Sequence, residues 1–218
     1  MLRVGLTGSL GSGKTTVAAI FREHGLHVLE ADAIARQMMG PGQEVFRRIA
    51  NHFGTSVVRP DGSLDRARLA TLAFSEGRLN ELNRIVHPPV IAEQERLTSE
   101  IFSREAHAIV VIESALIFEA EAWGTVPDWR QRFDRVILVT APDDLKIQRF
   151  LARILPENVT LELRAAAERD ARLRLAVQLP DAAKIPHCDY IIDNSGSLDS
   201  TRSQTERVAA ELRTSAGV

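Results

Sequence analysis

The stretch Gly8-Ser9-Leu10-Gly11-Ser12-Gly13-Lys14-Thr15 decides the fold of this chain, because it satisfies the pattern G-x-x-x-x-G-K-[ST]. The apolar run Leu2–Leu6 before it predicts a short buried strand, and a helix is expected from Lys14 to His24. Glycines in such a loop let backbone N–H groups turn inward around an anion, and the positive end of the following helix points to the same place. The stretch therefore predicts a phosphate-binding loop rather than a simple glycine-rich turn.

The expected contacts of this loop with a nucleotide divide between side chains and backbone. Lys14 is expected to reach the β- and γ-phosphates of ATP, and the Thr15 hydroxyl is expected to coordinate Mg²⁺. The other residues of the loop predicted to bind the nucleotide are Gly8, Gly11, Ser12, Gly13 and Thr16. ATP and Mg²⁺ are therefore the predicted cofactors.

Further apolar runs alternate with helical segments along the chain. The runs expected as strands are Leu26–Leu29, Ala108–Ile112, Arg135–Thr140 and Tyr190–Ile192. Continuous β-branched runs without hairpin signals are typical of parallel strands that are buried on both faces. The pattern predicts an α/β protein with the P-loop NTPase three-layer fold around a parallel sheet.

Three segments are expected to be helical: residues 33–105, residues 143–179, and the tail from Leu198 to about Arg213. Pro41-Gly42, Pro60-Asp61-Gly62 and Pro88-Pro89 are expected to interrupt the first segment. Asp65 or Ser63 is expected to cap a helix within it.

Composition narrows the class of partner. The chain has 218 residues, a formal net charge of -2 and only 5% aromatic residues, which argues against a nucleic-acid partner. The single cysteine, Cys188, cannot form an internal disulfide, and no apolar run approaches the ~18 residues of a membrane span. A cytoplasmic protein without a membrane partner is expected.

A phosphate-binding loop alone does not separate a kinase from a switch or a motor. The guanine-reading pattern N-K-x-D is absent from the sequence, which argues against a regulatory GTPase. The chain is also short for the additional domains of most motor ATPases. A small kinase is favoured, with a kinase for another nucleotide or nucleoside and a nucleotide-dependent switch protein as the alternatives.

Five separated motifs stand in order along the chain: Leu6–Thr15, Glu30–Arg36, Leu82–Pro88, Leu116–Glu119 and Asp189–Gly196. Together they resemble the dephospho-CoA kinase family over nearly the whole chain. Within these motifs the departures from that family's pattern are Ser9 for glycine, Glu30 for aspartate and Ala115 for proline. The resemblance implies transfer of the ATP γ-phosphoryl group to the ribose 3′-hydroxyl of dephospho-CoA, which completes coenzyme A. It also implies a small-molecule acceptor, and it leaves the oligomeric state open.

The Glu30–Arg36 motif supplies the predicted acceptor side. Asp32 follows a strand expected beside the P-loop strand, where its carboxylate can accept the proton of the ribose hydroxyl. The alternative role for Asp32 is that of a helix N-cap. Arg36 lies one helical turn after Asp32, where it is expected either to bind substrate or to form a surface ion pair. The resemblance places His87 toward the acceptor, and Pro88 is expected to make it extended.

A second group of polar residues is predicted around the phosphates. Lys146, Arg149 and Arg153 stand at helical spacing, and the family has glutamine in place of Lys146. Arg149 and Arg153 resemble lid arginines that neutralise charge on the transferred phosphoryl group. The resemblance also places Asn194 near the adenine of ATP, although Asn-Ser-Gly is equally a turn sequence. The alternatives for Glu113 are ordering of Mg²⁺ and a solvated strand end.

The expected layout is a single P-loop kinase domain in three parts. The core comprises residues 1–32, 106–142 and 186–218, the acceptor lobe residues 33–105, and the lid residues 143–185. Arg174 and Gln178 match a later family element, but residues 153–174 form a longer segment than the family usually has. The identity of the arginine that reaches the phosphates is therefore left open.

Overall fold

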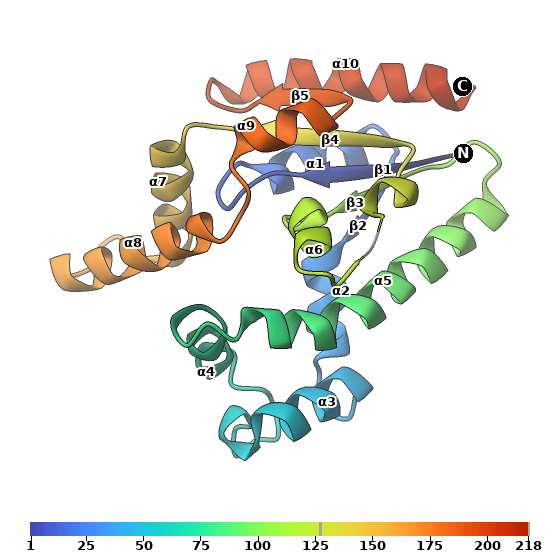
Figure 1. Cartoon of the computed structure of the whole chain (residues 1–218). Coiled ribbons are helices and arrows are strands. Elements are labelled where there is room, and N and C mark those ends of the chain that lie inside the picture. The colour runs from blue at the N-terminus through green and yellow to red at the C-terminus, as the bar shows by residue number, and fades with distance from the viewer. Residues whose placement is uncertain (127, 218) are drawn as a thin grey trace.

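A parallel sheet forms the centre of the molecule (Figure 1). The computed structural model describes residues 1–126 and 128–217, and within them the sheet has five strands in the order β2-β3-β1-β4-β5. The strands are β1 (Leu2–Thr7), β2 (His27–Glu30), β3 (Ile109–Glu113), β4 (Arg135–Thr140) and β5 (Tyr190–Asp193). Each strand pairs in parallel with its neighbours, so the predicted α/β class is confirmed.

The position of β2 differs from the expectation that it lies beside the P-loop strand β1. Strand β3 lies between them. The five residues of β3 are all buried, as suits a central strand, whereas all four residues of β2 are partly exposed, as suits a strand at the edge of the sheet. The register aligns Leu6 of β1 with Glu113 of β3, and Glu113 with Glu30 of β2. The carboxyl end of β3 therefore separates the phosphate-binding loop from the start of the Glu30–Arg36 motif.

Helices cover both faces of the sheet and make three layers (Figure 1). Side chains alternate along a strand, so Ile109 and Val111 of β3 face one layer while Val110 and Ile112 face the other. Helices α1 (Lys14–Glu23) and α10 (Leu198–Ala216) pack on the first face. Helix α6 (Ile117–Ala122), the turn Trp129–Arg132 and part of α5 (Leu79–Arg104) cover the second.

The helical lobe that we expect to bind the acceptor has its own apolar core. It contains α2 (Ala31–Met38), α3 (Glu44–Phe53), α4 (Arg66–Ala70), the π-helical turn Thr71–Ser75 and the first half of α5, with a 3-10 turn at Thr55–Val57. The carboxylate of Asp65 accepts the amide of Arg68 at 3.0 Å, so Asp65, one of the two candidate caps, caps α4. The core of the lobe is built from buried side chains that include Val45, Ile49, Leu69, Ile85 and Val90.

The prediction that Pro88-Pro89 interrupts the helical segment is wrong, because both prolines lie inside α5. Proline removes a backbone donor and clashes with the carbonyl four residues before it, so α5 changes direction near its middle (Figure 1). Burial of Val86 and Val90 on either side holds the helix together across this defect. His87 is therefore helical and not extended.

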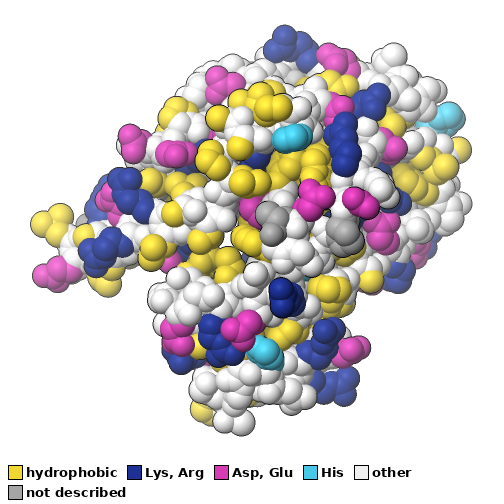
Figure 2. Space-filling model, in the orientation of Figure 1, with side chains coloured by type: hydrophobic (Ala, Val, Ile, Leu, Met, Phe, Trp, Pro, Cys, Tyr) yellow, Lys and Arg dark blue, Asp and Glu magenta, His cyan; other side chains and the backbone are white. Residues whose placement is uncertain are grey.

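The segment expected as the lid contains α7 (Asp143–Ile154), α8 (Leu161–Ala176) and α9 (Asp181–Lys184). Its separate apolar core is formed by Ile147, Phe150, Leu151 and Ala171. Helix α8 projects away from the sheet (Figure 1), and apolar side chains lie on its surface (Figure 2), among them Leu161 with 85% exposure. None of the helices in the described part of the chain is long and apolar enough to cross a membrane.

Candidate active site

The phosphate-binding loop lies against the lid on one side and the last strand on the other. Gly11 and Gly13 have positive φ values of 71° and 96°. A Cβ atom at Gly11 would overlap the backbone carbonyl of Lys146, and one at Gly13 would overlap the side chain of Asn194. The loop therefore needs glycine at both positions for conformation and for close approach.

Lys14 opens α1 and directs its ammonium group back over the loop. Its Nζ atom donates to the carbonyls of Gly8 at 2.7 Å and Ser9 at 3.2 Å. Burial of the ammonium group lowers the pKa of Lys14, while the nearby carboxylates of Glu113 and Asp32 act to raise it. The Thr16 amide donates to the carbonyl of Gly13 at 3.0 Å, whereas the helix offers no acceptor to the amides that precede it, at its first turn. This is a preformed site for an anion.

The carboxylates opposite Lys14 come from the ends of β2 and β3. Glu113 is 9% exposed; burial raises its pKa, and the charge of Lys14 opposes that change. Glu30 forms an ion pair with Arg22 at 2.5 Å. Glu30 is also the N-cap residue of α2, so Asp32 stands inside the first turn and does not cap the helix. Asp32 remains exposed and lines the adjoining pocket.

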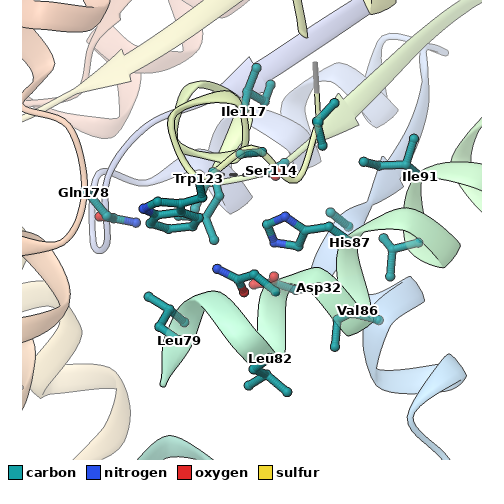
Figure 3. A pocket seen from close by; sticks show the side chains of 18 of the residues that line it. Asp32, Leu79, Leu82, Val86, His87, Ile91, Ser114, Ile117, Trp123 and Gln178 are labelled. Carbon is teal, nitrogen blue, oxygen red and sulfur yellow. Dashed lines mark hydrogen bonds between the residues drawn. The ribbon is translucent and has the colours of Figure 1, made fainter. Parts of the chain in front are cut away.

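The pocket has a volume of about 340 Å³ and extends from Leu10 of the phosphate-binding loop to the first half of α5. Its walls are mostly apolar, and Asp32, His87 and Trp123 face it from different elements (Figure 3). The Nε atom of Arg36 donates to the backbone carbonyl of Asp32 at 3.1 Å. Among the described residues no ion pair joins the two side chains, so the surface ion pair expected as one alternative is not formed.

His87 presents a neutral ring to this pocket. Burial lowers the pKa of His87 to about 4, and the charge of Arg132 contributes. The Thr125 hydroxyl donates to the carbonyl of Ala120 at 2.8 Å and lies 2.9 Å from Nδ1 of His87. Because the hydroxyl proton is already used, Nδ1 is the donor and Nε2 remains an acceptor.

Lys146 and the two lid arginines, Arg149 and Arg153, do not lie on one charged side of α7, although their helical spacing predicted that they would. Lys146 lies on the buried stripe of α7 with Ile147 and Phe150, is 2% exposed, and so turns inward. Arg153 is exposed, stacks 5.6 Å from the Phe150 ring, and its charge contributes to the lowered pKa of Lys14. In the part of the chain that the structure describes, Nη1 of Arg149 is buried without a hydrogen-bond partner.

Asn194 contacts the loop rather than open space. Its Nδ2 atom donates to the carbonyl of Ser12 at 2.8 Å, and its Oδ1 atom accepts the Thr201 hydroxyl at 2.7 Å. The side chain is 6% exposed. Its contacts fix the backbone of the phosphate-binding loop, and a direct contact with adenine stays a prediction.

Sequence reasoning missed three polar residues near the site. Asn83 lines the pocket, is 6% exposed and leaves its Nδ2 atom without a partner among the described residues. It stands four residues before His87 on one helix, and that spacing could have revealed it. Thr125 and Asp181 carry no comparable signal, because their partners are distant in sequence.

The sheet order, the glycine-rich loop with Lys14 at its end, and the pocket that adjoins it define the class of P-loop kinases. The family model described as "Dephospho-CoA kinase" matches residues 2–200. The chain belongs to the dephospho-CoA kinase family, and it is an enzyme.

Individual relatives and structures agree with this assignment. A dephospho-CoA kinase from Symbiobacterium thermophilum is 40% identical over 206 residues, which cover 93% of this chain and 78% of the relative. One from Corynebacterium glutamicum is 33% identical and covers 97% of this chain and 98% of the relative. The crystal structure of TT1252 from Thermus thermophilus is 33% identical with a TM-score of 0.69, and 97% of each chain is covered. A shikimate kinase from Acinetobacter baumannii, at 17% identity and a TM-score of 0.51 with 99% of this chain and 94% of that chain covered, shares the fold.

Proposed function

We propose that this enzyme transfers the γ-phosphoryl group of ATP to the ribose 3′-hydroxyl of dephospho-CoA and releases ADP and coenzyme A. The observation that carries the proposal is the continuity of the site. One pocket is lined by Leu10 of the phosphate-binding loop and by Asp32 and His87 of the acceptor lobe. A donor bound at Lys14 and an acceptor bound beside Asp32 would therefore meet in one continuous pocket, as in-line transfer requires.

The side chains divide the work between orientation and charge. Lys14 would hold the β- and γ-phosphates, and Asp32 would orient the acceptor hydroxyl and take its proton as oxygen attacks phosphorus. Arg149 and Arg153 would neutralise the charge that develops on the transferred group. Arg36 and the neutral His87 ring would bind the acceptor, the latter as a hydrogen-bond acceptor at Nε2.

The donor set near the loop fits Mg²⁺. Thr15 has an exposed hydroxyl at the start of α1, and Glu113 places a carboxylate opposite Lys14, so the available ligands are the oxygens that Mg²⁺ prefers. No group of three or more His, Cys, Asp or Glu side chains in the described residues is arranged to hold a metal alone. Mg²⁺ would therefore bind mainly through ATP, with Thr15 as its protein ligand, and would neutralise phosphate charge.

The test is turnover of a panel of acceptors with ADP formation as the readout. Dephospho-CoA should be phosphorylated, and the product should carry the new phosphate at the 3′ position. Adenosine, AMP and shikimate should react far more slowly. Preference for another nucleotide or nucleoside would support that kinase alternative, and slow hydrolysis unaffected by every acceptor would support a switch protein.

The remaining expectations accompany this proposal as predictions. They are the division into core, acceptor lobe and lid, a cytoplasmic location, and the absence of a nucleic-acid partner. The lid would close over the transferred phosphate and exclude water.

A further inference from the structure

The last part of the lid, residues 178–184, binds the phosphate-binding loop at two points. The Leu10 amide donates to Oε1 of Gln178 at 3.0 Å. The Ser9 hydroxyl donates to Oδ1 of Asp181 at 2.8 Å, and Ser9 is 3% exposed. The loop that holds ATP is thus fixed from the end of the lid as well as from its own helix.

The other oxygen of Asp181 binds the start of the lid. Lys146 donates from Nζ to Oδ2 of Asp181 at 2.7 Å and to Asp143 at 2.9 Å. The Asp181 side chain is 15% exposed and that of Asp143 is 75% exposed, so Asp181 is the less hydrated and stronger partner. The backbone carbonyl of Lys146 also lies against Gly11. One carboxylate therefore joins the loop to the first turns of α7.

This junction connects the helix that carries the two lid arginines to the loop that ends at Lys14. Arg149 and Arg153 follow Lys146 on the same helix at fixed spacing, and Lys14 ends the loop that contains Ser9. We infer that Asp181 is a positioning residue, which binds Ser9 and Lys146 together and so fixes the lid arginines relative to Lys14. The inference rests on the proposed phosphoryl transfer. Ser9 and Lys146 are also two places where the chain departs from the family pattern, and both departures meet at Asp181.

A matched pair of variants tests this role. Lys146→Met and Lys146→Gln are nearly equal in size and both remove the buried charge, but only glutamine can donate a hydrogen bond to Asp181. We expect Lys146→Gln to keep kcat within about threefold of the parent. Lys146→Met should lower kcat by about tenfold or more, because small displacements of charge-stabilising groups are costly. The dissociation constant for ATP should change less than kcat, since the arginine contacts strengthen in the transition state.

Melting temperatures separate this role from a merely structural one. Equal kcat values for the methionine and glutamine variants, or kcat losses that follow melting temperature alone, would overturn the inference. The parent serves as the control for the proposed function: if the parent does not phosphorylate dephospho-CoA, that proposal fails, whereas a parent that turns over with equal variants refutes only the role of Asp181.

A double-mutant cycle supplies a second test. Its added substitution, Ser9→Ala, removes a hydroxyl group and places no new group in the buried site. Ser9→Ala breaks the contact of Asp181 with the loop and leaves Lys146 in place. If Asp181 links the two, the kcat loss in Ser9→Ala/Lys146→Met should be clearly smaller than the product of the single losses. Losses that multiply would show two independent contacts and contradict the inference.

Discussion

Replacement of Asp32 by asparagine separates catalysis from helix stability. Glu30 is the N-cap residue of α2, so Asp32→Asn removes no capping bond. It removes only a negative charge from the first turn, which typically stabilises a helix by about 0.5 kcal/mol through the helix dipole. For a domain of this size that change lowers the melting temperature by about 1–2 °C.

The expected effect of Asp32→Asn on catalysis is far larger. An amide cannot take the proton of the acceptor hydroxyl, and loss of a general base typically costs about 100- to 10,000-fold in rate. Part of that loss would come from misorientation of the hydroxyl, because proton transfer is late in a loose phosphoryl transfer. Affinity for ATP should stay near the parent value, since Lys14 and the loop are unchanged.

One preparation of Asp32→Asn should be used for three measurements: kcat with dephospho-CoA by ADP release, the dissociation constant of ATP, and the melting temperature. A kcat near that of the parent would refute the assignment of Asp32 to the reaction. A melting temperature lowered by ten degrees or more would make the residue structural. A large fall in kcat with the other two quantities intact is the result that our reasoning requires.

Other changes act on the remaining groups. Lys14→Ala should abolish detectable turnover and keep the fold, because among the described residues the ammonium group binds two loop carbonyls and no side chain; unchanged kinetics would remove the phosphate-binding assignment. Arg149→Ala and Arg153→Ala should each lower kcat more than they weaken ground-state binding of either substrate. A rise in KM for ATP alone would show that these arginines bind the ground state and the transition state equally well. The pKa of His87 is depressed from 6.5 to about 4, so the unfolded chain binds more protons between these values and stability falls as pH drops through that window. Thermal unfolding at pH 7 and pH 5 should show a smaller loss in His87→Gln than in the parent, and equal losses would contradict a neutral buried ring.

Local patterns in the sequence were enough for the strands and for the loop. The five apolar runs lie within one or two residues of the observed strands. For the central strands the reason is that a strand buried on both faces needs an unbroken apolar run. The order of strands was less accessible. The separation of β2 from β1 by β3 depends on which strand is more buried, and periodicity does not show that.

The errors at Pro88-Pro89 and Lys146 have a common cause. Both predictions relied on local preferences: proline favours the end of a helix, and lysine favours a solvated helix face. Each preference corresponds to a free energy of a few kcal/mol or less. In α5 the burial of side chains on both sides of the prolines outweighs the local preference. At Lys146 the carboxylate of Asp181, 35 residues away in sequence, provides a partner that makes burial of the charge tolerable.

The attachment of the acceptor lobe to the sheet has a mechanical consequence. Strand β2 ends at Glu30 and α2 begins at Ala31, so no flexible linker joins them on that side. On the other side α5 runs from the pocket to the sheet as one helix, and Pro88 and Pro89 are the positions inside it that donate no backbone hydrogen bond. The lobe is therefore stiffly coupled to the core, with one compliant point within reach of His87. We expect the acceptor half of the site to stay fixed relative to the sheet during turnover. The lid, which has a small separate core, should supply most of the movement.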